Sequence, residues 1–194
     1  MIDVFEQIKD LLVFESKDDF YYLQVLQRKK ENPDIGSNSR VIKNYYINSI
    51  DYLEKKYPEI KALCEQFNAR AMLRLNKRSY KKVASKTIEK MLAMVLDENY
   101  FFVSRLYDKS CGKGHSDKRK KWILDMDGEY NEEFIQEVID FLEKCHPEGD
   151  KLILGLPTKN GLHLIVKPFN KKDFYEKYPN ITIHKDNPIN LYIP

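Results

Sequence analysis

The feature that most constrains this chain is the heptapeptide WILDMDG, Trp122–Gly128, in which two acidic residues alternate with apolar ones. Side chains alternate between the two faces of a strand, so Asp125 and Asp127 are expected on one face, with Cα atoms roughly 6.6 Å apart. Leu124 and Met126 surround the pair with apolar surface. Neighbouring carboxylates repel each other unless a positive charge joins them, and a divalent cation commonly does so. The pattern predicts a buried strand that presents a metal-binding pair beside a phosphate-bearing ligand.

A second informative stretch, PTKNGLHLIVKPFN at Pro157–Asn170, follows about one strand-and-helix unit later. It places His163 at the start of another apolar strand and Lys159 in the turn before it. An imidazole and an ammonium beside an acidic pair are groups suited to binding phosphate oxygens. A lone histidine in a sheet is more commonly an ordinary packed residue, so the functional interpretation depends on the acidic pair.

Composition bounds the class of protein. The chain has 194 residues, of which 42% are hydrophobic, 32% charged and 12% aromatic, values typical of a folded globular protein. The net charge of +3 says little by itself. No apolar run approaches the roughly 20 residues of a membrane-spanning helix, and the acidic, amphipathic Met1–Val13 is unlike a signal peptide. Three cysteines without a regular framework, Cys64, Cys111 and Cys145, favour a reducing, cytoplasmic setting.

A zinc site is a second interpretation of the cysteines. Cys111, His115, Cys145 and His146 are side chains of the kind that bind zinc. Adjacent residues such as Cys145 and His146 rarely both bind one ion, so free thiols are the simpler alternative.

Hydrophobic periodicity divides the chain into two α+β regions. In residues 1–120 the pattern predicts helices and aromatic-rich strands, followed by a mobile basic loop. The expected elements are a helix at Asp3–Val13, strands at Phe20–Arg28 and Arg40–Ile47, a helix capped by Ser49 and broken at Pro58, a strand at Ala71–Leu75, an amphipathic helix at Ser79–Leu96 and the loop at Asp108–Lys121.

In residues 121–194 the pattern predicts a compact α+β unit with a largely antiparallel sheet. The WILDMDG strand is followed by a helix capped by Asn131, a strand pair joined by a turn, a short helix and a second hairpin. The expected ranges are Lys151–Leu156 and Leu162–Lys167 for the strand pair, Asp173–Lys177 for the helix, and Ile181–Ile183 with Leu191–Ile193 for the hairpin around Asn187-Pro188. With helices on one face of the sheet, the aspartates are expected on a sheet floor between two lobes.

These motifs resemble the archaeo-eukaryotic primase superfamily, which includes the primase-polymerases. Its members carry an acidic pair in a strand, then a small residue, any residue and a histidine in a later strand, and then a third acid. WILDMDG is similar to the first motif and TKNGLHLIV to the second, with His163 at the histidine position. HKDNPINLY, His184–Tyr192, is similar in character to the segment near the third motif. The resemblance covers about Lys121–Pro194, and the earlier residues match only in element type.

The resemblance implies an N-terminal α/β lobe, residues 1–120, packed on an RRM-like antiparallel lobe, residues 121–194, with the site between them. It implies a nucleotidyltransferase of DNA replication that adds nucleotides on a nucleic-acid template. Asp125 and Asp127 would bind Mg²⁺ or Mn²⁺, and His163 would act with them. The implied partners are nucleoside triphosphates, single-stranded or template DNA and a separate helicase.

The remaining site residues follow from the same resemblance. Lys159, His163 and Lys185 are predicted to bind the nucleotide phosphates. The expected strand Ile181–Ile183 carries no acid, and Asp186 is the nearest candidate for a third metal ligand.

Two basic clusters flank the proposed site in sequence. Such clusters suit phosphate backbones, although charge runs are commonly solvated surfaces. Arg78, presented by the turn Asn76–Ser79, is predicted to bind phosphate, and Tyr80 and Tyr107 are predicted to stack on bases. The clusters are Arg70, Arg74, Lys77, Arg78, Lys81 and Lys82, and then Lys113, Lys118, Arg119, Lys120 and Lys121.

Two alternatives stay open. A primase-like fold whose third acid is lost can serve as a non-catalytic nucleic-acid-binding module. ILDMDG also resembles the first motif of haloacid-dehalogenase-type phosphatases, in which the first aspartate is the nucleophile. Against the phosphatase, Glu129 stands where a small hydroxylic or apolar residue is expected, and only 66 residues follow Gly128 (194 − 128), too few for the remaining parallel sheet.

Overall fold

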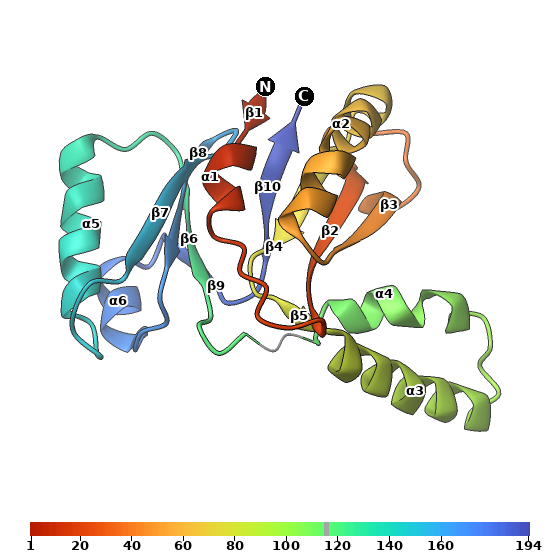
Figure 1. Ribbon diagram of the computed structural model, residues 1–194. Coiled ribbons are helices and arrows are strands. Elements are labelled where there is room, and N and C mark those ends of the chain that lie inside the picture. The colour runs from red at the N-terminus through yellow and green to blue at the C-terminus, as the bar shows by residue number, and fades with distance from the viewer. Residues whose placement is uncertain (115–116) are drawn as a thin grey trace. The chain divides into compact units, whose positions relative to one another are not determined.

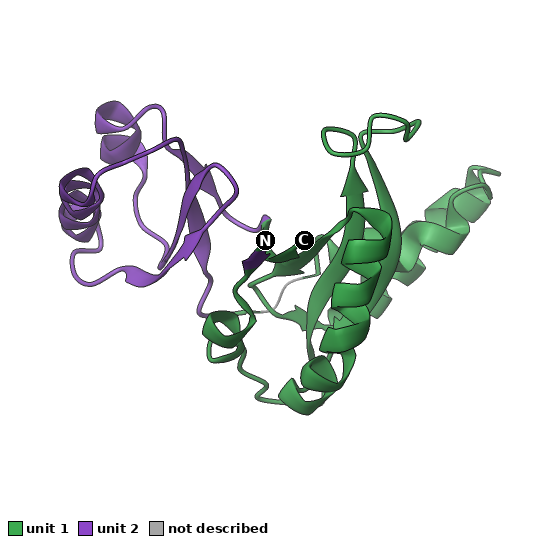
Figure 2. Ribbon diagram, turned by 90° about the horizontal axis from the view of Figure 1, so that it is seen from above, with its two compact units in different colours: residues 1, 3–118, 188–194 green, residues 2, 119–187 purple. Residues whose placement is uncertain are grey.

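The computed structural model describes residues 1–114 and 117–194 and shows a mixed α+β protein with two antiparallel sheets (Figure 1). The chain forms two compact units, coloured separately in Figure 2. Unit 1 consists of Met1, Asp3–Lys118 and Pro188–Pro194, and unit 2 of Ile2 and Arg119–Asn187. In the part of the chain that the structure describes, no helix combines the length and apolar character needed to cross a membrane.

The sheet of unit 1 has the strand order β1-β10-β4-β2-β3, with the short strand β5 paired to β2. Aromatic and β-branched residues are frequent in its two longest strands, which pair antiparallel from Tyr21 opposite Ile47 to Arg28 opposite Ser39. The expected strands are therefore present, with ends shifted by a residue or two. The bounds are β1 Ile2–Asp3, β2 Asp19–Arg28, β3 Ser39–Ile47, β4 Arg70–Arg74, β5 Arg78–Ser79 and β10 Pro188–Ile193.

Helix α2, Ile50–Phe67, packs on one face of this sheet. Ser49 caps it by accepting a hydrogen bond from the Tyr52 backbone N–H, as expected. Its buried face includes Leu53 and Ile60. The predicted break at Pro58 is wrong, because the helix continues through that residue. The short helix α1, Phe5–Lys9, also belongs to unit 1 and is shorter than predicted.

The opposite face of the same sheet carries a different cluster. Phe20 and Tyr22 of β2 pack with Val83 and Cys111. Val83 lies on α3, Tyr80–Leu96, and Cys111 ends α4, Leu106–Cys111, which follows the short 3-10 helix η1, Val103–Arg105. The predicted mobile loop at Asp108–Lys121 therefore begins as a helix.

The apolar stripe of α3 is exposed. The helix forms where predicted and is capped by Ser79, but in the described chain only Val83 is buried along it. Ile88 is 67% exposed and Leu92 59% exposed. The periodicity thus predicted the helix correctly, while most of the stripe does not contribute to the core of this chain.

The sheet of unit 2 has the order β7-β8-β6-β9, and all its pairings are antiparallel. Its elements follow in the order strand, helix, strand, strand, helix, strand. Asn131 caps the first helix by accepting from the Phe134 backbone N–H, as predicted. The bounds are β6 Trp122–Asp127, α5 Glu132–Lys144, β7 Leu152–Pro157, β8 Gly161–Val166, α6 Lys172–Lys177 and β9 Thr182–His184.

One face of this second sheet supplies the core of unit 2. Leu124 and Met126 of β6 and Leu164 of β8 pack with Val138 and Leu142 of α5 and with Phe174 of α6. Figure 1 shows both helices on the same side of the sheet. Residues one position away along β6 and β8 therefore project from the opposite face.

The predicted C-terminal hairpin is wrong. β9 pairs with β6, whereas β10 pairs antiparallel with β4 in the sheet of unit 1, with Ile189 opposite Leu73. Residues 188–194 therefore belong to unit 1 rather than to the second lobe. Local sequence does not distinguish these arrangements, because two short strands around Asn187-Pro188 fit a hairpin as well as a passage between sheets.

Candidate active site

The acidic pair lies on the face of β6 that points away from α5 and α6. Leu124 and Met126 are fully buried in the core of unit 2, so the alternation of the strand puts Asp125 and Asp127 on the other side. The Asp125 side chain is 26% exposed, and Asp127, at the end of the strand, is more exposed. The predicted same-face geometry of the two carboxylates is therefore present.

His163 lies directly opposite Asp125 in the antiparallel pair of β6 and β8. Its Nε2 is 3.1 Å from Asp125 Oδ1, and its side chain is only 13% exposed. Cross-strand partners on one face are close neighbours, so this contact follows from the register of the two strands. The structure thus brings together Asp125, Asp127 and His163, the three residues that the two motifs predicted for the site.

Gly161 makes this register sterically feasible. It lies opposite Asp127, and a Cβ atom built on it would be 2.0 Å from the carbonyl oxygen of Met126. A contact with backbone this short cannot be relieved by moving a side chain. The residue that follows β6 also approaches the turn, because the Gly128 N–H donates to the Asn160 carbonyl at 2.7 Å. The glycine of the Gly-x-His motif is therefore explained by close approach of two backbones.

A third side chain, His184 of β9, completes the cluster. Its Nε2 is 3.4 Å from Asp125 Oδ2, so the two oxygens of this carboxylate face two imidazoles from the two neighbouring strands. The sequence reasoning missed this residue. The available signal was the alternation Thr182-Ile183-His184, because Ile183 is buried in the core and its neighbours must point the other way.

Asp186, the predicted third acid, lies beyond the end of β9. Along β9 the register runs from Thr182 opposite Asp125 to His184 opposite Ile123. Continuing this register carries Asp186 toward the Trp122 end of β6, away from Asp127. The β9 side chain that contacts Asp125 is therefore a histidine rather than an acid.

Burial lowers the pKa of the His163 imidazole below 6.5, and the negative charge of Asp125 opposes this shift only partly. His163 is therefore mainly neutral at pH 7. A neutral imidazole donates one hydrogen bond from one nitrogen and accepts at the other, so His163 is suited to a hydrogen bond or to metal binding.

The donor set of this cluster consists of carboxylate oxygens and imidazole nitrogens. Such a set suits Mn²⁺ well and Mg²⁺ through its carboxylates. In the described part of the chain, no group of three or more His, Cys, Asp or Glu side chains is already arranged around a metal position. Binding a cation at Asp125 would thus require its present contacts with the imidazoles to rearrange.

The predicted phosphate-binding lysines occupy exposed positions in unit 2. Lys159 lies in the turn between β7 and β8, next to the Asp127 end of β6. Lys185 follows β9, and its Nζ lies 5.2 Å from the centroid of the Trp122 ring. Lys159 is therefore placed near the acidic pair, whereas Lys185 is at the other end of β6.

Arg78 has a different setting from the predicted one. It belongs to unit 1 and is fully buried, and its guanidinium donates to the carbonyl oxygens of Cys111 at 2.7 Å and Asn76 at 2.6 Å. A guanidinium enclosed in this way ties backbone segments together and is not accessible to a nucleotide. Its role is structural.

Other members of the first basic cluster are also engaged within unit 1. Arg70 pairs with Glu31, and Lys77 lies 2.6 Å from Glu15 and 3.0 Å from Asp19. The predicted base-stacking tyrosines pack internally as well, since Tyr80 stacks on Phe20 and Tyr107 packs edge-on against Tyr46. Lys81, Lys82 and the exposed lysines at 113, 118 and 120 remain on the surface.

The structure gives the zinc interpretation no support from the described residues. Cys111 is fully buried in the aromatic cluster of unit 1, and the Cys145 thiol donates to the Phe141 carbonyl at 3.5 Å. Burial raises the pKa of the Cys111 thiol to about 12, which disfavours the thiolate that zinc requires. His115 lies outside the described residues.

The comparisons with known proteins found no relative of this chain. No family model matches the chain, and the searches of curated proteins and of solved structures returned no match.

Proposed function

We propose that this protein is a primase- or polymerase-like nucleotidyltransferase that adds nucleotides on a nucleic-acid template with Mn²⁺ or Mg²⁺. The observation that supports this most strongly is the meeting of Asp125, Asp127 and His163 on one face of an antiparallel sheet, with 3.1 Å between His163 Nε2 and Asp125 Oδ1. The two motifs that carry these residues are far apart in sequence, and their register brings them into contact.

We further propose that unit 2 is the RRM-like lobe of a primase-like protein. Its elements follow the order strand, helix, strand, strand, helix, strand, and its sheet has the order β7-β8-β6-β9. This succession of elements supports the proposal, because it is the one typical of ferredoxin-like and RRM-like domains. Unit 1 then corresponds to the N-terminal α/β lobe.

Each residue of the cluster has a proposed role. Asp125 and Asp127 would hold the divalent cation through their carboxylates, with His184 as an additional nitrogen donor. When bound, the cation would activate the attacking hydroxyl and neutralise charge on the phosphate oxygens. His163, mainly neutral at pH 7, would donate a hydrogen bond to the triphosphate, and the exposed Lys159 would contribute positive charge.

A specific observation favours a second candidate function. The third position beside Asp125 is His184 rather than an acid, and both imidazoles contact Asp125. A non-catalytic primase-like module that binds nucleic acid has no requirement for a full set of metal-binding acids. The phosphatase alternative is not retained, because β6 pairs antiparallel with both of its neighbours and that family requires a parallel sheet.

The deciding experiment is incorporation of labelled nucleotides on primed and unprimed templates with Mn²⁺ or Mg²⁺. We expect incorporation by the wild type, and its loss by at least a hundredfold in Asp125→Asn and in Asp127→Asn, because each removes a carboxylate from the cation. Asp150→Asn is the matched control, since this carboxylate is 74% exposed and lies only near Lys167 at 3.7 Å.

Two results would reject the enzymatic proposal. One is a wild type that binds single strands but incorporates nothing with either cation, which would favour the binding module. The other is full activity in both aspartate variants.

A further inference from the structure

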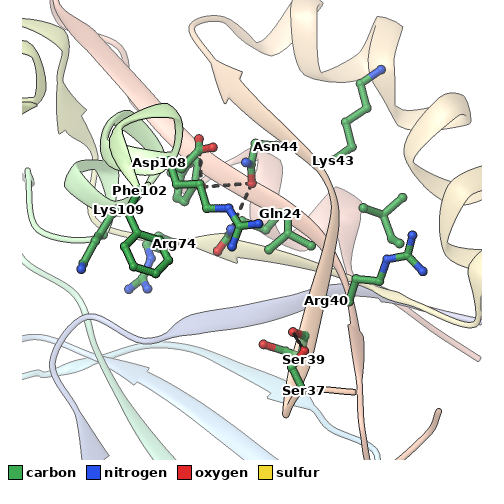
Figure 3. Close-up of a pocket in the computed structure, with 15 residues that line it drawn as sticks. Gln24, Ser37, Ser39, Arg40, Lys43, Asn44, Arg74, Phe102, Asp108 and Lys109 are labelled. Atoms are coloured by element: carbon green, nitrogen blue, oxygen red, sulfur yellow. Dashed lines mark hydrogen bonds between the residues drawn. The ribbon is translucent and has the colours of Figure 1, made fainter. Parts of the chain in front are cut away.

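Unit 1 contains a cavity of about 1060 Å³ that no sequence motif indicated (Figure 3). It lies on the sheet face opposite α2. Tyr22, Gln24 and Asn44 contribute to its lining from β2 and β3, and α4 contributes Asp108 and Lys109. Its volume lies at the upper end of the usual range of about 300–1,000 Å³ for ligand pockets. The space is therefore large enough for a segment of a longer ligand.

The floor of the cavity is polar and ordered. Gln24 and Asn44 are cross-strand partners, and Gln24 Nε2 donates to Asn44 Oδ1 at 3.0 Å. The Tyr22 hydroxyl donates to the same oxygen at 3.0 Å. Among the described residues, the side-chain oxygen Oε1 of Gln24 and the side-chain nitrogen Nδ2 of Asn44 have no hydrogen-bond partner, so an acceptor and a donor are available side by side. This pairing of groups suits the edge of a nucleic-acid base.

Positive charge lines the cavity. Arg105 and Lys109 are four residues apart around the start of α4, and Arg40 lies on β3. No described residue forms an ion pair with any of these three. Lys43 also lines the cavity, but its ammonium pairs with Glu59 of α2, and Figure 3 shows it pointing away. Three cations are thus available for phosphate groups.

The single acid in the lining is already bonded. Asp108 Oδ1 accepts a hydrogen bond from the Tyr46 hydroxyl, and the Tyr22 hydroxyl, which donates to Asn44, has its oxygen 3.3 Å from the same carboxylate oxygen. Burial together with the charge of Asp108 raises the pKa of both phenols, so they remain protonated donors. The carboxylate is held in place by these donors, and the balance of charge in the cavity stays positive.

An aromatic ring stands at the edge of the cavity. Phe102 lines it and is 48% exposed, next to the 83% exposed Phe101. Contiguous exposed apolar surface commonly marks an interaction site, and Tyr100, Phe101 and Phe102 are three consecutive exposed aromatic residues. A ring beside dispersed cations and free amide groups is the combination by which proteins hold single strands, with bases stacked and phosphates neutralised.

We infer that this cavity binds single-stranded nucleic acid, with phosphates at Arg40, Arg105 and Lys109 and a base stacked on Phe102. The inference stands on unit 1 alone and holds for either candidate function above. The cations that it uses are different from those that the sequence clusters indicated.

The test is fluorescence-anisotropy binding of a labelled twelve-nucleotide oligothymidylate to the full chain at several salt concentrations. The double variant Arg105→Glu/Lys109→Glu should weaken binding at least tenfold and make it less dependent on salt, because fewer counterions are released. Phe102→Ala should weaken binding about fivefold or more with the salt dependence unchanged. All three residues are exposed or near the surface, so the variants are expected to fold.

Lys17→Glu/Lys55→Glu is the matched control, because both lysines are exposed and outside the cavity lining and the change in net charge is the same. Equal weakening in this control would show general electrostatic attraction and reject the site. Tripolyphosphate or ATP competing as well as the unlabelled oligonucleotide would also reject it, because the cavity would then be a small-anion site. Direct binding of the oligonucleotide is measured without free nucleotides or divalent cations, so failure of this inference is distinguished from failure of the proposed chemistry.

Photo-crosslinking gives an independent measurement. A bromodeoxyuridine oligonucleotide should crosslink to a peptide that contains Phe102, and the Arg105→Glu/Lys109→Glu variant should lose this product. Crosslinks confined to peptides outside the cavity lining would overturn the inference.

Discussion

The two sheets of this protein are both antiparallel but present different chemistry. In unit 2 helices α5 and α6 pack on one face, whereas in unit 1 helix α2 packs on one face and α3 and α4 contribute an aromatic cluster on the other. The face of the second sheet away from its helices gathers Asp125, His163 and His184 within 3.1–3.4 Å contacts. The face of the first sheet away from α2 also carries amides and separated cations around a large cavity.

The two sites differ in how firmly the positions of their side chains are fixed. The acid–imidazole cluster depends on strand register, so its atoms are fixed by backbone pairing and by one glycine. The cavity depends on long side chains whose charged ends have no fixed partner in the described chain, which suits a flexible ligand. Reaction chemistry requires groups held at fixed positions, as in the acid–imidazole cluster. Binding that tolerates different sequences suits mobile charged side chains, as in the cavity.

The largest effect is expected from Gly161→Ala, which tests whether register fixes the cluster of unit 2. The added Cβ would be 2.0 Å from the Met126 carbonyl oxygen, so we expect a loss of about 3 kcal/mol in the unfolding free energy of unit 2. Urea unfolding followed by Trp122 fluorescence measures this, because Trp122 is the chain's single tryptophan. In Gly155→Ala the nearest atom would be at 3.6 Å, an ordinary contact, so this control should change stability by less than about 0.5 kcal/mol. Equal stability of the two variants would contradict the role given to Gly161.

Arg78→Met tests the distinction between structural and binding cations in unit 1. The change leaves the carbonyls of Asn76 and Cys111 without this donor, and we expect a loss of about 2–3 kcal/mol in urea unfolding followed by far-UV circular dichroism. Arg40→Met is the matched control, since Arg40 is exposed, and it should lose less than about 0.5 kcal/mol while weakening strand binding. If Arg40→Met destabilised the protein as much as Arg78→Met, the distinction would be lost.

A smaller effect on stability is expected from substitutions in α3, and it should differ between its buried and exposed sides. Val83→Ala opens space in the aromatic cluster of unit 1 and should reduce the unfolding free energy by about 1–2 kcal/mol. Leu92→Ala, at a side chain that is 59% exposed, should reduce it by less than about 0.5 kcal/mol. Chemical denaturation of both variants checks this, and a larger loss in Leu92→Ala would mean that the stripe is covered in solution.

The smallest effect concerns the pKa of His163. Burial lowers this pKa below 6.5 and Asp125 opposes the shift, so Asp125→Asn should lower the pKa further. Between the lowered value and 6.5, the unfolded chain binds a proton that the folded chain does not, so stability falls as the pH drops through this window. Asp125→Asn should widen the window. NMR titration of the imidazole measures the change, and a rise in the pKa would contradict the arrangement.

Much of the fold follows from local pattern. The alternation in Trp122–Asp127, the caps at Ser49 and Asn131, and the aromatic strand candidates all predicted elements that are present. One error is local, because α2 continues through Pro58 although proline commonly interrupts a helix. The other error depended on distant residues, since β10 pairs with β4 rather than β9, and pairing partners more than a hundred residues apart leave no local signal.

The candidate site was likewise predictable only in part. Asp125, Asp127 and His163 were found because motif spacing and strand alternation act together. His184 was missed because a search for a third acid passed over a histidine, and Asp186 was preferred by charge alone. Arg78 was misjudged because a basic residue in a polar turn gives no local indication that its guanidinium will be enclosed by carbonyls from Asn76 and Cys111.

The placement of β10 sets an order on biosynthesis. β10 lies between β1 and β4 in the first sheet, yet its residues are synthesised only after the whole of unit 2. While the ribosome is still translating codon 187, every strand and helix of unit 2 has already been made, but the earlier-made sheet still has a gap between two of its strands. Synthesis of unit 1 therefore starts before that of unit 2, but its sheet can be completed only afterwards. Until β10 has been synthesised, the edges of β1 and β4 that pair with it have no partner strand.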